Sequence, residues 1–167
     1  MRKNQCGISK FSSVDTPFGS ISVNSDLNNM LNLADSNMFS YLSTIDDLEE
    51  HSLELQYPFI CNLFDRNDIK ILPVQIGIFL KEAERTKAAS ILMDSISSFY
   101  KENEVIFVIS SDFCHFGKRF DYTPVPTSIS ETSIDEYVRI LDLKAFIAIN
   151  NGEESIKSFS HYIYETS

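Results

Sequence analysis

The residue types best suited to chemistry lie together in one short stretch, Ser110–Gly117. Within it Asp112, Cys114 and His115 bring a carboxylate, a thiol and an imidazole into four consecutive positions. An imidazole can take up and release protons near neutral pH, and a thiol becomes reactive when its pKa is lowered. Three such groups in one place indicate a functional site.

Each of these residues also has a purely structural interpretation. Asp112 can be a turn residue that bonds to nearby backbone, Cys114 a small buried hydrophobe, and His115 a structural histidine. For any one of them alone the structural interpretation is the better one. The three together, directly after an expected strand, favour a site.

That expected strand is Val105–Ile109, which is entirely apolar and mostly β-branched. Such a run is typical of a strand buried on both faces of a parallel sheet. Ligands of open α/β sheets bind beyond the carboxyl ends of the strands, which is where Asp112–His115 falls. Gly117 then lets the backbone turn, and Lys118 and Arg119 add positive charge beside it.

The elements before this strand predict the fold class. Ile69–Phe79 is expected to be a strand with a bulge or an edge position at Pro73, because proline has no N–H to donate. Leu80–Lys101 has apolar residues at helical spacing and predicts a long helix. Together with the Val105–Ile109 strand they form a right-handed crossover, with two parallel strands beside the site. The predicted class is α/β, with a mixed, largely parallel sheet flanked by helices.

The rest of the chain alternates short strands and helices. We expect a strand over Ser20–Val23, a helix capped by Asp26, an acidic solvated face or first helical turn over Asp46–Glu50, a loop over Asp121–Thr132, a helix pair over Asp135–Ile149, a break at Asn150–Gly152 and a helix over Glu153–Tyr164. Met1–Ser13 is polar and expected to be flexible, which leaves residues 14–167 as a single α/β domain.

Composition excludes several classes of protein. A length of 167 residues suits one domain, and a formal net charge of −10 argues against nucleic acid or an anionic membrane as the main partner. No apolar run approaches the roughly 20 residues of a membrane span. Cys6, Cys61 and Cys114 are odd in number and far apart, which indicates a reducing compartment, so we expect a cytoplasmic protein.

The sequence SSDFCHFG at Ser110–Gly117, followed by Arg119 and Phe120, resembles the SSDFCHWG-x-RF signature of the Memo family. That family comprises the mediators of receptor-driven cell motility and their microbial relatives. Phe116 stands where the family commonly has Trp and keeps an aromatic ring after the histidine. The resemblance extends from about Ser12 to the C-terminal end and is strongest in two short motifs.

The second motif is EHSLE at Glu50–Glu54, with Pro58 after it, which resembles the E-H-S-x-E…P segment of the same family. Memo proteins are similar in fold to class III extradiol dioxygenases, in which the matching histidine is an iron ligand. The resemblance therefore implies that His51 is a metal ligand. Glu54 is either the carboxylate to which this imidazole donates or a solvated surface residue. Pro58 should kink the helix or delay its start.

The resemblance also implies roles for the residues of the first motif and indicates which segments of the family this sequence lacks. The residue matching His115 is an acid–base group in the dioxygenases, and Asp112 would orient it. Family segments of the Gly-Pro-Ser-His and Cys-Gly-Arg-x-Pro types, which supply a further His and a Cys to the site, do not occur in this sequence. The chain thus corresponds to the middle of a Memo protein, and we expect weak binding of iron or copper and self-association through an open sheet edge.

Two classes of function remain open. In the first, the protein is a metal-dependent oxidoreductase or a relic of one, and His51 converges with Asp112 and His115 on one cleft. In the second, it is a signalling adaptor whose cleft binds a phosphorylated or acidic peptide, with Arg119 meeting the anion. Cys114 is reactive if its side chain points into the cleft beside this positive charge, and is packing otherwise.

Overall fold

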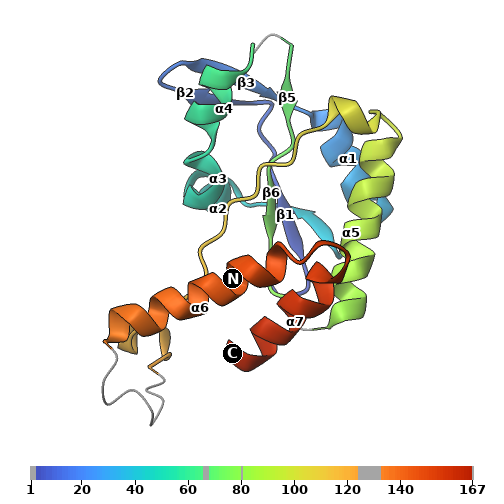
Figure 1. Ribbon diagram of the computed structural model, residues 1–167. Coiled ribbons are helices and arrows are strands. Elements are labelled where there is room, and N and C mark those ends of the chain that lie inside the picture. The colour runs from blue at the N-terminus through green and yellow to red at the C-terminus, as the bar shows by residue number, and fades with distance from the viewer. Residues whose placement is uncertain (1–2, 66–67, 80, 124–132, 167) are drawn as a thin grey trace. The chain divides into compact units, whose positions relative to one another are not determined.

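The computed structural model describes residues 3–65, 68–79, 81–123 and 133–166, and the chain forms two compact units. Unit 1 is Met1–Ser110 and unit 2 is Ser111–Ser167. The described strands belong to unit 1, whereas the described part of unit 2 is helical or irregular (Figure 1). The boundary between the units falls after Ser110, and the expectation of a single domain over residues 14–167 stays a prediction.

Unit 1 contains two small mixed sheets, which confirms the predicted α/β class. In the first sheet the strand order is β4–β1–β6, with β1 parallel to β4 and antiparallel to β6. In the second the order is β2–β3–β5, with β3 antiparallel to β2 and parallel to β5. The strands are β1 (Cys6–Ile8), β2 (Ser13–Thr16), β3 (Gly19–Val23), β4 (Phe39–Tyr41), β5 (Lys70–Ile71) and β6 (Val74–Ile76).

The core of unit 1 is built around β1, whose residues are all buried. Helices α1 (Ser25–Ala34) and α5 (Glu82–Ser97) pack against this sheet and against each other (Figure 1). The buried core side chains are those of Cys6, Ile8, Leu31, Met38, Phe39, Phe79 and Ala88. The expectation of a flexible Met1–Ser13 was therefore wrong for Cys6–Ile8.

The helices of unit 1 largely follow the sequence. Helix α5 lies inside the predicted Leu80–Lys101, whereas α1 is capped by Asn24, whose side chain accepts from the N–H of Leu27, and not by Asp26. The remaining helices are α2 (Thr44–Leu48), α3 (His51–Glu54) and α4 (Tyr57–Leu63). As expected, Pro58 falls in the first turn of α4, after a break at residues 55–56.

The predicted strand over Val105–Ile109 was wrong. After a 3-10 turn, η1 (Glu102–Glu104), the described chain has no strand between residues 105 and 116, and the side chains of Ile106 through Ile109 are exposed. The crossover unit that depended on this strand is therefore also wrong. The run has the composition of a buried strand, but no described strand lies beside it to pair with its backbone.

The predicted strand over Ile69–Phe79 is divided in two at Leu72 and Pro73. Its halves, β5 and β6, belong to different sheets, and each lies at a sheet edge. Pro73 itself lies in neither half, so in place of the expected bulge or edge position the chain changes sheet at Leu72 and Pro73. Proline suits this corner because its missing N–H needs no ladder partner.

Unit 2 is a pair of packed helices, α6 (Ile134–Ile149) and α7 (Ser155–Thr166), with Ala145, Ala148 and Tyr162 buried between them. Helix α6 is continuous, so the predicted helix pair over Asp135–Ile149 was wrong. The break at Asn150–Gly152 is confirmed, and Gly152 adopts a left-handed φ of 57° there. Residues 124–132 of the predicted loop lie outside the described residues. No helix of the described chain is long and apolar enough to cross a membrane.

Gly7 supplies a stability test, because a Cβ atom there would lie 2.9 Å from Cγ of buried Leu42 and closer still to its Cδ2. We expect Gly7→Ala to destabilise unit 1 by about 1–3 kcal/mol through overpacking. The free energy of unfolding is measured by urea unfolding, with hydrogen exchange of the β1 amides as the probe. In a Leu42→Ala background the same change should cost much less, and an equal cost in both backgrounds would contradict the clash.

Candidate active site

Unit 2 begins with the residues that the sequence singled out. Nε2 of His115 lies 2.8 Å from Oδ2 of Asp112, and the His115 ring meets the ring of Phe120 edge-on at a centroid distance of 4.9 Å. The carboxylate and the aromatic ring together hold the imidazole in one orientation. The pair is open to water, with 48% of the His115 side chain and 82% of the Asp112 side chain exposed.

His115 borders a hollow of about 190 Å³ formed within unit 2. Its walls come from the segment after Ser111, from the turn around Phe120, and from both helices. The lining residues are Phe113, Cys114, His115, Phe120, Tyr122, Leu141 and Tyr162. Because three consecutive side chains face one hollow, the segment does not alternate between two faces as a strand would. The hollow is large enough for a few small polar or aromatic groups beside the imidazole.

A short closed loop holds the far wall of the hollow. Gly117 donates its N–H to the carbonyl of Tyr122 at 2.8 Å, and the Tyr122 N–H returns to the carbonyl of Gly117 at 3.4 Å. Gly117 has a φ of 135°, which a residue with a side chain rarely adopts, so its place in the motif has a conformational reason. The turn η2 (Lys118–Phe120) inside this loop carries the two cations and presents the Phe120 ring to His115.

The environment of Cys114 makes its thiol less reactive. Burial, and then the nearby carboxylate of Asp142, raise the pKa of this thiol above its ordinary value. Asp142 also accepts the backbone N–H of Cys114 at 3.0 Å, which ties the motif to α6. Both causes favour the neutral thiol, so Cys114 is expected to react slowly although it lines the hollow.

Tyr122 is the second residue lining the hollow whose pKa is shifted. Burial raises its pKa to about 12, and a hydrogen bond with Tyr137 and the charges of neighbouring tyrosines and Cys114 act in the same direction. Because the hydrogen bond with Tyr137 also raises the pKa, Tyr122 is its donor. Tyr122 therefore stays protonated at neutral pH, and its oxygen can accept a hydrogen bond from a group in the hollow. Sequence reasoning missed Tyr122, Tyr137 and Asp142, although an aspartate between two leucines of an apolar helix was a visible signal for the last.

His51 lies in unit 1, where it is the first residue of α3 and is exposed. Glu50, the first residue of the EHSLE motif, caps this helix by accepting the N–H groups of Ser52 and Leu53 at 3.1 and 2.6 Å. Glu54 is also exposed, and within the described part of the chain no hydrogen bond joins it to His51. The convergence of His51 with His115 and Asp112 stays a prediction, because the two units are described separately.

The residues present do not form a metal site within either unit. Among the described residues of each unit, no three His, Cys, Asp or Glu side chains are grouped so that they could hold a metal ion. In unit 2, Nε2 of His115 already contacts the carboxylate of Asp112.

The chain thus has an α/β unit and a helical unit that carries a histidine–carboxylate pair at the edge of a hollow. Over residues 1–166 the sequence matches the family described as Memo-like protein, and the chain belongs to this family. The Memo resemblance of the two motifs is thereby confirmed.

Relatives in this family come from fungi and animals. The chain is 30% identical to MEMO1 family protein MHO1 of Saccharomyces cerevisiae, an alignment that covers 98% of this chain and 52% of that protein. It is 30% identical to the memo-1 homolog of Caenorhabditis elegans, over 98% of this chain and 44% of the relative. With MEMO1 family protein C4H3.04c of Schizosaccharomyces pombe it shares 38% identity, over 71% and 38% respectively. The chain thus spans about half the length of these relatives, or less.

We expect Cys114 to be alkylated slowly, because its raised pKa lowers the fraction of thiolate at neutral pH. Asp142→Asn keeps an oxygen that can accept the Cys114 N–H but removes the charge, so the thiol pKa should fall and alkylation should quicken by a few-fold. Iodoacetamide labelling resolved by mass spectrometry across a pH series measures both effects. Asp135→Asn, on the same helix, is the control and should change nothing. Wild-type labelling faster than that of a free cysteine would contradict the argument.

Proposed function

We propose that unit 2 carries the proton-transfer residues of a Memo-like redox cleft, with His115 as the acid–base group and Asp112 as the residue that orients it. The observation that supports this is the 2.8 Å contact between Nε2 of His115 and Oδ2 of Asp112 at the edge of the hollow. With Nε2 held by the carboxylate, Nδ1 is the nitrogen left to exchange a proton with a bound molecule. The Tyr122 oxygen would accept a hydrogen bond from that molecule.

The metal-binding part of the proposal rests on the family motif. We propose that His51 supplies one ligand for iron or copper. The metal would be held weakly by this chain, because the described residues of neither unit provide a set of three ligands. When bound, such a metal would supply the redox chemistry. Metal affinity depends on the number and fixed geometry of ligands, so ligands from the remainder of a full-length relative would raise it.

The metal content of two proteins tests this part. The chain as printed should retain little iron or copper, whereas a version extended at both ends to the length of its relatives should retain one metal ion. In the extended protein His51→Ala should weaken binding by at least about 10–100-fold, the loss typical of even an outer partner of a metal ligand. Elemental analysis and titration with the metal alone measure this, with His161→Ala as the control. Tight one-to-one retention by the short chain, lost with His51→Ala, would show that the expectation of weak binding is wrong.

The acid–base role predicts a different result from a ligand role. In the extended, iron-loaded protein, His115→Gln should lower oxygen consumption with ascorbate by about 10²–10⁴-fold and leave the metal content unchanged. Asp112→Asn should cause a smaller loss, because it leaves the imidazole in place but oriented less well. His161→Gln is again the control. Unchanged oxygen consumption, or a loss fully explained by missing metal, would contradict the assignment of His115.

A second candidate function, binding of a phosphorylated or acidic peptide, is favoured by the cations of η2. Lys118 and Arg119 are exposed, and the Arg119 guanidinium carbon lies 5.7 Å from the centroid of the Phe120 ring that lines the hollow. An arginine stacked in this way is held ready to contact a phosphate with two hydrogen bonds.

For this candidate we expect a fluorescent peptide with one phosphotyrosine to bind more tightly than its unphosphorylated twin. Arg119→Gln should remove the difference, and addition of a chelator should not. Arg139→Gln is the matched control, because Arg139 is already paired with Glu136. Equal binding of the two peptides to the wild-type chain would exclude this function.

A further inference from the structure

The pairing segment, defined as Val105–Ile109, is an unusual stretch of unit 1. The exposed fractions of its last four residues are 69% for Ile106, 54% for Phe107, 48% for Val108 and 86% for Ile109. The backbone of these four residues makes no hydrogen bond within the described part of the chain. Apolar side chains and open peptide groups therefore occur together, as on an unprotected edge strand.

The segment is held at both ends. At its start the N–H of Val105 donates to the carbonyl of Glu102 at 3.4 Å, and Val105 itself is extended, with φ −123° and ψ 133°. Just after its end, Gln56 Nε2 donates to Oγ of Ser110 at 3.4 Å. Figure 1 shows the chain between these two points as a drawn-out trace without helix or strand. Less conformational entropy is lost when a tethered segment pairs than when a free one does.

The segment, VIFVI, has a symmetric pattern of residue classes, with two β-branched residues on either side of Phe107. When two copies lie antiparallel with Phe107 opposite Phe107, each β-branched residue faces another one across the ladder. Val105 then faces Ile109 of the second copy, and Ile106 faces its Val108. Aromatic and β-branched neighbours are the cross-strand pairs that stabilise sheets, and a twofold axis requires such a self-complementary patch.

We propose that the pairing segment is a self-association site, at which a second copy of this chain adds an antiparallel strand with the twofold axis at Phe107. The segment is uncharged, whereas its flanks are acidic: Glu102 would face Asp112 of the second copy, and this repulsion ends the ladder near Val105 and Ser110. The chain also has a net charge of −10, so two copies repel each other at low ionic strength. Added salt screens both terms and should therefore strengthen the dimer. The proposal is independent of the proposed function.

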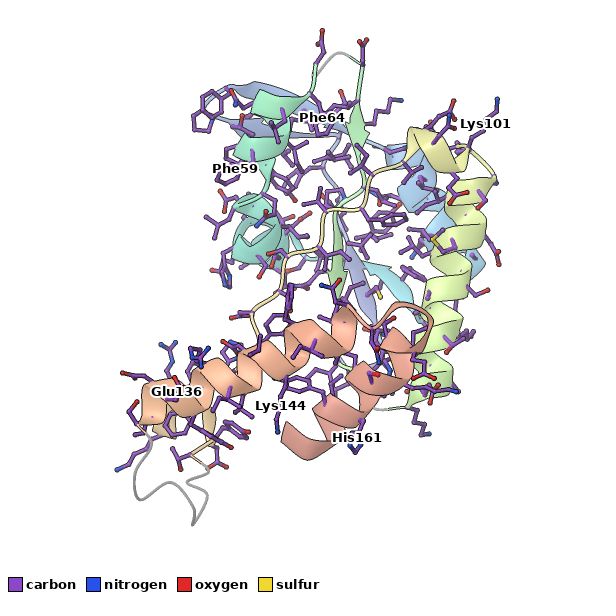
Figure 2. The ribbon with its side chains drawn as sticks, in the orientation of Figure 1. Phe59, Phe64, Lys101, Glu136, Lys144 and His161 are labelled. Atoms are coloured by element: carbon purple, nitrogen blue, oxygen red, sulfur yellow. The ribbon has the colours of Figure 1, made fainter. Side chains whose placement is uncertain are left out.

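Sedimentation velocity of the chain as printed, over a wide range of protein and salt concentration, is the first test. The wild type should show a reversible monomer–dimer equilibrium that salt shifts toward the dimer. Phe107→Lys places two charges opposite each other at the axis and should leave the monomer only. Phe59→Lys is the matched control, because Phe59 is an exposed phenylalanine on α4 whose side chain extends outward from the helix (Figure 2).

A wild type that stays monomeric overturns the proposal, as does a dimer that Phe107→Lys leaves intact. Protected amides at Ile106–Ile109 in a monomeric chain would show that another part of the same molecule covers the segment, and would overturn it as well. Circular dichroism checks that both variants are folded.

Cross-linking tests the register without relying on loss of association. In a Cys114→Ser background, Phe107→Cys should form a disulfide-linked dimer on mild oxidation, since residues on the axis lie directly opposite each other within disulfide range. Ile106→Cys should cross-link far less, because its counterpart in the second copy lies across the ladder at a diagonal distance. Equal cross-linking at both positions, or none at Phe107→Cys, would contradict the proposed pairing.

Discussion

The structure of unit 1 depends on one requirement: a buried strand needs hydrogen-bond partners along both of its edges. β1 is short and fully buried, and β4 and β6 meet that requirement from opposite sides. Bonds beyond the ladder extend the pairing, with the N–H of Leu42 donating to the carbonyl of Ile8 at 2.9 Å and the N–H of Gly77 to that of Gln5 at 3.0 Å. Helices α1 and α5 then cover the apolar side chains that this sheet presents.

The pairing segment shows the same requirement unmet. Its side chains are more apolar than those of β1, but they are exposed because no described strand bonds to its backbone. Hydrophobicity alone therefore does not bury an extended segment in this chain. The segment leads directly into Asp112 and His115. A strand that paired with the segment would therefore also fix the position at which the candidate site begins.

Elements with a strong local signal could be predicted from the sequence. The alternation of β3, the long amphipathic α5, the break before Pro58 and the turn at Gly152 all come from a few neighbouring residues. β1 was missed because Cys6-Gly7-Ile8 has little strand character, and its burial depends on partners far along the chain.

The candidate site shows the same limit. Residue types and spacing were enough to pair Asp112 with His115, since three residues apart is a local relation. Asp142 and Tyr122, however, reach the motif through the packing of α6 and the loop closed at Gly117, and no short pattern encodes that contact. The raised pKa of Cys114 could not be predicted either, because its causes are burial within unit 2 and then the carboxylate of Asp142 on a distant helix.

The place of β1 in the sheet has a consequence for synthesis on the ribosome. β1 is made first, but its antiparallel partner β6 is made only after most of unit 1 has been translated. At roughly 5–20 residues per second, the nascent β1 waits several seconds with one edge open. Its parallel partner β4 is synthesised earlier than β6. A β1–β4 pair packed against α1 is therefore the form of the nascent chain that a chaperone would bind.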